Sequence, residues 1–350
     1  MFCFFASFNH AQQTNSENTA IQTGVVDLHN DRSFFITAKQ TPFATCQTMA
    51  LCAANYKNMR FFFSLWRPNK IRPDGKPWGL NQTQILVLRS ESHFDYLLRA
   101  IQDLKETKIP VSDNPEDLLK PESFLFLGVE GAYLLNNNKP YSILNLRQMM
   151  KTLKQQKVSY ITLTWSEEND YAGAHWQTAK GLTEKGKQFI RLSMEFRILI
   201  DLSHASEKTV LDFYRFTKGK YPLFFSHSSV QSIHRHSRNV SDSILKKIQE
   251  TQGLIGINFY TKYLNGKKTA TLNDVVRHIE KAVQIAGYDY VALGSDFDGF
   301  ISLPDNLQKA EHVQNLIREL YSRNWTKENI AKLLYQNVYR VLKKYKNADG

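Results

Sequence analysis

Residues 196–227 read FRILIDLSHASEKTVLDFYRFTKGKYPLFFSH, and this stretch contains the pattern from which the fold can be predicted. An apolar run ends at His204, a segment with helical periodicity follows over 206–216, and a second apolar run ends at His227. Two apolar strands joined by a helix form a unit in which the strands run parallel.

The same alternation continues along the rest of the chain. Eight short segments rich in Val, Ile, Phe and Leu have the length of strands. The predicted strands span 24–31, 59–66, 123–130, 158–165, 196–204, 221–227, 253–260 and 290–296. The predicted helices span 90–105, 142–156, 183–195, 206–216, 241–250, 272–286, 306–322 and 327–344. Near-continuous apolar strands that alternate with helices indicate a parallel sheet covered on both faces, either doubly wound or closed into a barrel.

The count of eight strands favours the closed form, an α/β protein with a (β/α)8 TIM barrel and extra C-terminal helices. The chain has 350 residues, 42% of them hydrophobic and 22% charged, which is typical of globular proteins and excludes a disordered or fibrous class. Since no internal repeat or linker interrupts the pattern, we expect one metallohydrolase domain over 24–350. The stretch 68–84 is expected to be a long loop near the site.

Residues 1–23 are expected to lie outside this domain. Their apolar start resembles an export signal but lacks a basic region, so they are either a remnant signal or a flexible arm. A signal would place the protein in the periplasm or outside the cell; the alternative is the cytoplasm. Cys3, Cys46 and Cys52 form no CxxC pair, and Cys46 and Cys52 are expected in the core or, alternatively, in a disulfide. No run of about 20 apolar residues indicates a transmembrane segment.

The formal net charge is +12, with a pI of about 9.4. The lysines are scattered over helical patterns, which is typical of solvated helix faces, and the usual nucleic-acid-binding signatures are absent from the sequence. We therefore expect no nucleic-acid partner. A protein that binds anionic surfaces is the alternative, and it predicts binding that weakens steeply with salt.

Polar residues recur where the predicted strands end. In a parallel barrel all these ends lie on one face, which carries the catalytic groups. The residues concerned are His29, Asp31, Glu130, His204, His227, Tyr260 and Asp296. His29 and Asp31 lie two apart on a predicted strand, so both side chains should point the same way. Glu130 ends an apolar run, where a carboxylate needs a partner: a metal ion, a helix N-terminus or a buried ion pair.

Three imidazoles and two carboxylates are a ligand set that suits zinc. Five ligands are too many for one tetrahedral ion with an open position, whereas two ions that share a carboxylate account for all five. Asp201, Ser203, Ser226 and Ser228 are candidates to orient the imidazoles, and Asp27 is either a further one or a core polar contact. Asp296 would move the proton between the attacking water and the leaving amine; an ordinary turn is its alternative.

Ordered motifs from about Gly24 onward resemble the membrane dipeptidase family, also called renal dipeptidase, within the amidohydrolase barrels. The motifs are DLHND at 27–31, GVEG at 128–131, GLTEKG at 181–186, DLSH at 201–204, SHS at 226–228, Arg238-Asn239, Asn258-Phe-Tyr260, GSDFDG at 294–299, and Asn337 with Arg340. The resemblance implies that His29 and Asp31 hold one zinc ion, that His204 and His227 hold the other, and that Glu130 bridges them.

The resemblance also implies that Asp296 is the proton shuttle, that Arg238 binds the terminal carboxylate of the substrate, and that Tyr260 lines the pocket and stabilises the oxyanion. Two features depart from the family pattern. Trp165 replaces a substrate-contacting histidine, so either the chain belongs to a branch of the family that uses a tryptophan there, or its substrate differs, or His175 reaches in from the next loop. In addition, residues 32–34 read Arg-Ser-Phe instead of Leu-Pro-Trp.

We therefore predict a dipeptidase with two Zn²⁺ ions that hydrolyses small dipeptides, with a homodimer as its assembly. Alternatives are a related binuclear amidohydrolase acting on another small amide or lactone, and a catalytically impaired barrel that binds ligands.

Overall fold

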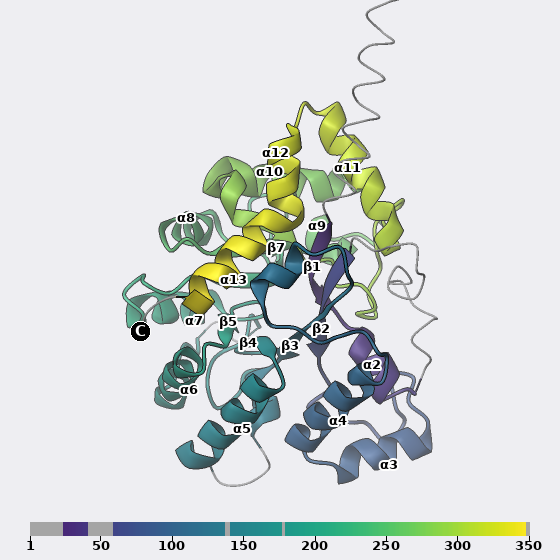
Figure 1. The fold of residues 1–350 in the computed structure, drawn as a ribbon, viewed down its shortest axis with the longest axis vertical. Helices are drawn as coiled ribbons and strands as arrows, with labels where there is room; N and C mark the ends of the chain where they lie inside the picture. The colour runs from purple at the N-terminus through teal and green to yellow at the C-terminus, as the bar shows by residue number, and fades with distance from the viewer. Residues whose placement is uncertain (1–23, 41–58, 137–140, 177–178, 348–350) are drawn as a thin grey trace, which may run out of the picture.

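Eight parallel strands close into a barrel whose order around the ring is the order in the chain, β1 to β8 (Figure 1). The computed structural model describes residues 24–40, 59–136, 141–176 and 179–347. The strands are β1 (Val25–Asn30), β2 (Met59–Leu65), β3 (Leu125–Glu130), β4 (Val158–Thr162), β5 (Leu199–Asp201), β6 (Phe224–Ser228), β7 (Leu254–Ile257) and β8 (Val291–Leu293). The predicted (β/α)8 barrel is confirmed, and each strand lies within its predicted segment except β6, which extends one residue beyond it to Ser228.

Helices surround the barrel on the outside. They are α2 (Arg32–Thr37), α3 (Gln82–Ser90), α4 (His93–Lys105), α5 (Ile143–Gln155), α6 (Glu184–Glu195), α7 (Glu207–Phe216), α8 (Asp242–Glu250), α9 (Thr261–Leu264), α10 (Leu272–Ala286), α11 (Val313–Ser322), α12 (Lys327–Ala331) and α13 (Asn337–Asn347). Ser92, Ser142 and Ser206 accept a hydrogen bond from a first-turn amide and so fix where α4, α5 and α7 begin. A π-helical turn joins α12 to α13, so the extra C-terminal helices are also confirmed.

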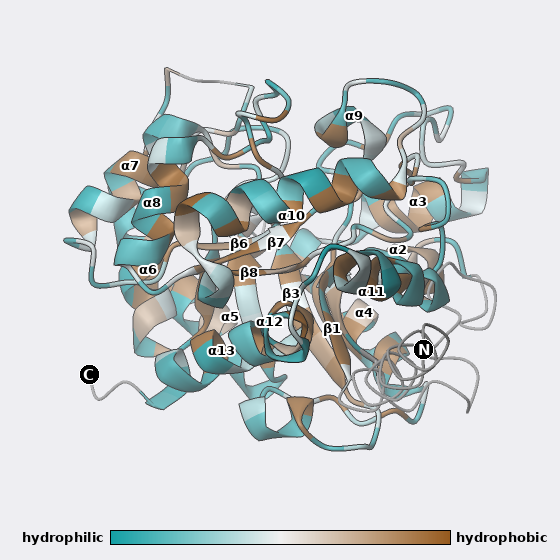
Figure 2. Cartoon of the chain, turned by 90° about the horizontal axis from the view of Figure 1, so that it is seen from above, coloured by the Kyte–Doolittle hydropathy of each residue, from teal (hydrophilic) through white to brown (hydrophobic). Residues whose placement is uncertain are grey.

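Aromatic rings fill the barrel beneath the site. The ring of Phe62 lies 4.9 Å from that of Phe126 and 5.9 Å from that of Tyr160, which in turn lies 5.6 Å from Phe224. A side chain at Gly128 would come within 2.1 Å of the Tyr160 ring, so this strand position must stay small. Figure 2 shows apolar strands, in brown, surrounded by helices whose outer faces are hydrophilic, in teal. The apolar core therefore lies inside the ring of helices.

The strands are shorter than predicted. Three short helices, α2, α3 and α9, were not predicted. Helices α2 and α9 have six and four residues, too few to show a helical period. The predicted loop over 68–84 ends earlier, because Asn81 and Gln84 form a capping box that starts α3. Cys3, Cys46, Cys52 and the expected arm at 1–23 lie outside the described residues. Across the described part of the chain, no helix combines the length and apolarity that crossing a bilayer requires.

Candidate metal centre

The predicted polar residues do gather at the carboxyl ends of the strands, although several lie beyond the strands themselves. His29 and His227 belong to β1 and β6, and Glu130 is the last residue of β3. Asp31 follows β1 by one residue, and His204 and Asp296 follow β5 and β8 by three. The prediction that strands end in these residues was therefore wrong in detail, because the loops rather than the strands carry part of the site.

Strand alternation was also the wrong reason for pairing His29 with Asp31. Asp31 is not on the strand but precedes α2, with φ −94° and ψ 14°, so strand alternation does not orient its side chain. The turn into the helix nevertheless brings its Oδ1 to 3.5 Å from His29 Nε2. His204 and Asp296 are likewise aimed by unusual backbone, since both have a left-handed φ, 67° and 66°. Such conformations are costly for these residue types and concentrate at functional sites.

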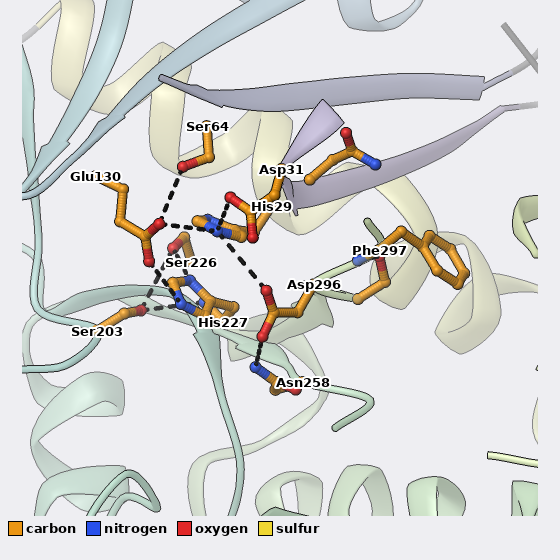
Figure 3. Close-up of polar contacts among 12 residues, drawn as sticks. His29, Asp31, Ser64, Glu130, Ser203, Ser226, His227, Asn258, Asp296 and Phe297 are labelled. Atoms are coloured by element: carbon orange, nitrogen blue, oxygen red, sulfur yellow. Dashed lines mark hydrogen bonds and ion pairs between the residues drawn. The ribbon is translucent and has the colours of Figure 1, made fainter. Parts of the chain in front are cut away.

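The Glu130 carboxylate turns its two oxygens toward different histidines, one toward His29 and the other toward His227 (Figure 3). Its Oε1 is 3.0 Å from His204 Nε2 and 3.4 Å from His227 Nε2. Its Oε2 is 3.7 Å from His29 Nε2 and accepts a hydrogen bond of 3.3 Å from the Ser64 hydroxyl. One oxygen thus faces the β5 and β6 side of the barrel and the other faces the β1 side.

These groups have the chemistry and spacing of ligands for divalent metal ions. Two donors held about 2.1 Å from one ion lie about 3 to 3.5 Å apart, and the distances from Glu130 to His204 and His227 fall in this range. His29 Nε2 and Asp31 Oδ1 are buried without a hydrogen-bond partner, which is costly unless a cation satisfies them. Donor atoms of His29, Glu130 and His227, and of His29, Asp31 and Asp296, converge closely enough to hold ions.

A hydrogen-bond relay fixes the tautomer of His227. Ser226 Oγ lies 2.6 Å from Asp201 Oδ2 and 2.7 Å from His227 Nδ1. Because a carboxylate only accepts, the serine hydroxyl donates to Asp201 and accepts from the Nδ1–H of His227. The Nε2 lone pair then faces His204 and Glu130, as a metal ligand requires. Ser203 Oγ supports this relay by accepting from the His227 amide, 3.1 Å away.

The other two candidates to orient imidazoles do something else. The Ser228 hydroxyl accepts from Arg238 Nη1 at 3.3 Å and does not contact a histidine ring. Asp27 accepts from the amide of Ser295 at 2.7 Å and from the hydroxyl of the same residue, and so ties β1 to the end of β8. Burial raises the pKa of Asp27 to about 6 despite these donors. Asp27 is thus a core polar contact, one of the two interpretations that the sequence left open.

Burial and neighbouring charges shift the pKa values of Glu130, His29 and His204. Burial raises the pKa of Glu130, and the Asp31 and Asp296 carboxylates add to the effect. Burial lowers the pKa of His29, but the Glu130 and Asp31 carboxylates outweigh it and raise the value to about 10. Burial and the Arg238 cation hold His204 far below the usual histidine pKa. A divalent cation would supply the positive charge that these carboxylates lack, and it would replace the proton on His29, because only a neutral imidazole coordinates a metal ion.

Asp296 lies between His29 and Asn258. Its Oδ1 is 4.0 Å from His29 Nε2, and its Oδ2 accepts a hydrogen bond of 2.9 Å from Asn258 Nδ2. Burial and the nearby Asp31 carboxylate raise its pKa to about 6. Asn258 is fully buried and also accepts from the Tyr260 amide, so it fixes both Asp296 and the start of α9.

Arg238 and Tyr260 lie on the β6 and β7 side of the rim. Arg238 is almost fully buried, since only 3% of its surface is exposed, and it donates to the His227 carbonyl at 3.0 Å. Its guanidinium carbon lies 5.3 Å from the ring centre of Tyr263, and the ring of Tyr260 packs 4.8 Å from that of Tyr263. Arg238 Nε has no hydrogen-bond partner within the described chain, so the guanidinium retains donor capacity.

Trp165 and His175 lie in different places. Trp165 packs against Trp66 at 5.1 Å and Trp78 at 6.2 Å. His175 is buried beside His204, with ring centres 5.9 Å apart, and its Nδ1 lies 2.8 Å from the hydroxyl of Ser237. His175 thus lies on the His204 side of the metal centre, whereas the part of the rim around Trp165 is aromatic.

Sequence reasoning missed the roles of Ser64, Asn258 and Gly299. Asn258 stands in one of the family motifs, but the motif gives it no role, and nothing near Ser64 marks it as a neighbour of Glu130. A side chain at Gly299 would lie 2.6 Å from Asp296 Oδ1 and 2.8 Å from Asp31 Oδ2, so the backbone passes directly over these carboxylates.

Comparison with known proteins places these residues in a family context. Residues 78–349 match the model of the membrane dipeptidase family, peptidase family M19. An uncharacterized dipeptidase of Schizosaccharomyces pombe is 35% identical over 226 residues, which is 62% of this chain and 52% of the yeast protein. The chain thus spans about half the length of this curated relative.

Solved structures share the fold. A metallopeptidase from Rhodobacter sphaeroides, bound to a phosphinate mimic of L-Ala-D-Ala, aligns with a TM-score of 0.73 at 20% identity over 93% of this chain and 99% of its own. A probable dipeptidase from Pseudomonas aeruginosa aligns with a TM-score of 0.78 at 16% identity over 95% of this chain and 98% of its own.

Proposed function

Because the chain belongs to the membrane dipeptidase family, peptidase family M19, we propose that it hydrolyses the peptide bond of small dipeptides at a centre of two divalent ions. The observation that carries this proposal is the position of Glu130, whose two oxygens face two separate sets of donors. A mononuclear site would need only one such set.

In this proposal His29 and Asp31 would hold one ion, His204 and His227 would hold the other, and Glu130 would contribute an oxygen to each. Three imidazoles with two carboxylates favour zinc over magnesium or calcium, which prefer oxygen ligands. When bound, such a pair would lower the pKa of a water molecule and polarise the scissile carbonyl.

The remaining groups bind the substrate and move a proton. Asp296, held at Oδ2 by Asn258, takes a proton from the attacking water at Oδ1 and delivers it to the leaving amine. Arg238 is anchored on the His227 carbonyl and binds the substrate carboxylate, for which its planar guanidinium is suited. Tyr260 donates toward the developing oxyanion, and Trp165 contributes to the pocket wall.

The test separates proton transfer from metal binding. Asp296→Asn keeps the shape of the side chain and the hydrogen-bonded position but cannot carry the proton. We expect kcat toward Ala-Ala to fall at least about 100-fold, while the metal content after dialysis stays at the wild-type value. Asp305→Asn, at an exposed position, is the control and should retain activity. Full activity in Asp296→Asn, or a metal-loaded wild-type protein that cleaves no dipeptide, would contradict the proposal.

A further inference from the structure

Five aromatic side chains form a continuous cluster at the rim beside the metal centre, and the proposed chemistry does not use most of them. They are Phe34, Trp66, Trp78, Trp165 and Phe300, hereafter the aromatic cluster. The ring of Trp66 lies 4.8 Å from each of Phe34 and Trp78 and 5.1 Å from Trp165. Phe300 closes the group, at 5.4 Å from Trp78 and 5.8 Å from Phe34.

The loops that carry the aromatic cluster also carry the metal centre. Phe34 lies three residues after Asp31, in the helix that Asp31 precedes. Trp66 lies two residues after Ser64, whose hydroxyl contacts Glu130. Phe300 directly follows Gly299, the backbone position that lies over the Asp31 and Asp296 carboxylates. The same three loops therefore carry both the rings and groups of the proposed metal centre.

The aromatic cluster has a buried base and an open face. Phe34 and Trp66 are 0% and 3% exposed, whereas Phe300 is 40% exposed and Trp78 and Trp165 are half-buried. The base is explained by packing alone. The open rings are not, because an exposed group of large apolar side chains costs solubility and generally marks a binding surface.

The position of the aromatic cluster across the barrel indicates which part of a dipeptide it would meet. Arg238 is anchored at the end of β6 through the His227 carbonyl. In a closed ring of eight strands, β6 lies opposite β2, the strand that leads to Trp66. A dipeptide with its carboxylate on Arg238 and its peptide bond at Glu130 would extend its N-terminal residue toward the aromatic cluster.

We infer that the aromatic cluster is the subsite for the side chain of the N-terminal residue, and that the preferred substrates are dipeptides that begin with an aromatic or large apolar residue. This inference rests on the proposed function and adds its substrate class. Trp165, a departure from the family pattern, belongs to the cluster and would contribute ring contacts where an imidazole would contribute hydrogen bonds.

One charged group at the edge of the cluster offers a competing specificity. Lys39 Nζ lies 4.9 Å from the ring centre of Phe35 and 5.3 Å from that of Phe300. If this ammonium rather than the rings governed selection, dipeptides that begin with glutamate would be preferred. The substrate set therefore includes an acidic member.

The experiment compares kcat/KM for Phe-Ala, Gly-Ala and Glu-Ala with metal-loaded protein. In the wild type we expect kcat/KM for Phe-Ala to exceed that for Gly-Ala at least about tenfold. The ratio should fall toward one in Trp78→Ala and in Phe300→Ala. Tyr288→Ala is the matched control, because Tyr288 is also partly exposed and packs on a tryptophan, Trp325, outside the site. It should keep the wild-type ratio.

Binding supplies a second measurement that does not need turnover. The affinities of phosphinate analogues of Phe-Ala and Gly-Ala are followed through tryptophan fluorescence, and the first should bind at least about tenfold more tightly. Three results would overturn the subsite and leave dipeptide hydrolysis intact. They are a ratio of kcat/KM for Phe-Ala to Gly-Ala near one in the wild type, an unchanged ratio in both cluster variants, and a preference for Glu-Ala. Selective binding without hydrolysis of any dipeptide would keep the subsite and overturn the function, whereas neither binding nor hydrolysis would overturn both.

Discussion

Removal of the Ser226 hydroxyl would test whether the relay behind His227 sets the metal affinity. In the folded protein this hydroxyl lies 2.7 Å from His227 Nδ1 and 2.6 Å from Asp201 Oδ2, and all three residues are at most 1% exposed. Ser226→Ala leaves the Nδ1–H without an acceptor in a dry environment. Asp201 keeps other donors, among them Thr162 Oγ1 at 2.7 Å, so the main loss falls on the imidazole.

The expected loss of unfolding free energy in Ser226→Ala follows from the number of buried polar groups left without a partner. One buried donor without a partner costs about 1–3 kcal/mol, so the metal-free variant should lose that much unfolding free energy. Loss of the group that orients a ligand typically weakens metal binding about 10- to 100-fold. At about 1.4 kcal/mol for each factor of ten, the metal-loaded variant should lose about 1.4–2.8 kcal/mol more.

The assay combines urea unfolding with chelator competition, each with and without metal. Ser228→Ala is the matched control, because this hydroxyl is equally buried but contacts Arg238 instead of a proposed ligand. It should keep the metal affinity and raise the KM for dipeptides. Unchanged metal affinity in Ser226→Ala, or an equal loss in Ser228→Ala, would refute the relay.

Two further predictions concern close packing and pH. Gly299→Ala should weaken metal binding and lower activity at least about tenfold, because its Cβ would lie 2.6 Å from Asp296 Oδ1; wild-type values for both would contradict this. His278 is buried, accepts from the Val230 amide and contacts the Leu264 carbonyl, and burial lowers its pKa to about 4. Between pH 6.5 and 4 the imidazole of His278 binds a proton in the unfolded chain but not in the folded chain. The free energy of unfolding is therefore unaffected by the protonation of His278 above pH 6.5 and decreases as the pH falls from 6.5 to 4. This decrease amounts to about 3 kcal/mol. In urea unfolding of metal-free His278→Asn, the free energy of unfolding should therefore depend less steeply on pH.

Much of the fold and of the ligand set could be predicted because these features repeat locally. Apolar strands alternate with helical segments eight times, and that count led to the barrel. His204 and His227 each follow an apolar run and a serine, a repeated pattern that marks them as a pair in the sequence. Such patterns are visible in the sequence because each depends on neighbours within about ten residues.

Other features depend on distances between loops that are remote in sequence. Ser64 lies 66 residues from Glu130, and Asn258 lies 38 residues from Asp296, so neither contact has a local signal. The backbone turns that aim Asp31 and Asp296 were equally hidden, and alternation along a strand was the wrong reason for placing Asp31. The serines behind the histidines show the same limit, because Ser226 supports His227 whereas Ser228 supports Arg238.

The sequence by itself determined which chemical groups stand at the barrel rim, because the strand period and the parallel topology bring the ends of all strands to one face. Tertiary structure alone decided which groups touch. Glu130 turns one oxygen to each side, Asn258 holds Asp296, and Trp165 packs with other aromatic rings while His175 lies beside His204. The physical reason is that contacts of a few ångströms between loops depend on backbone turns and packing, and no periodicity in the chain encodes these.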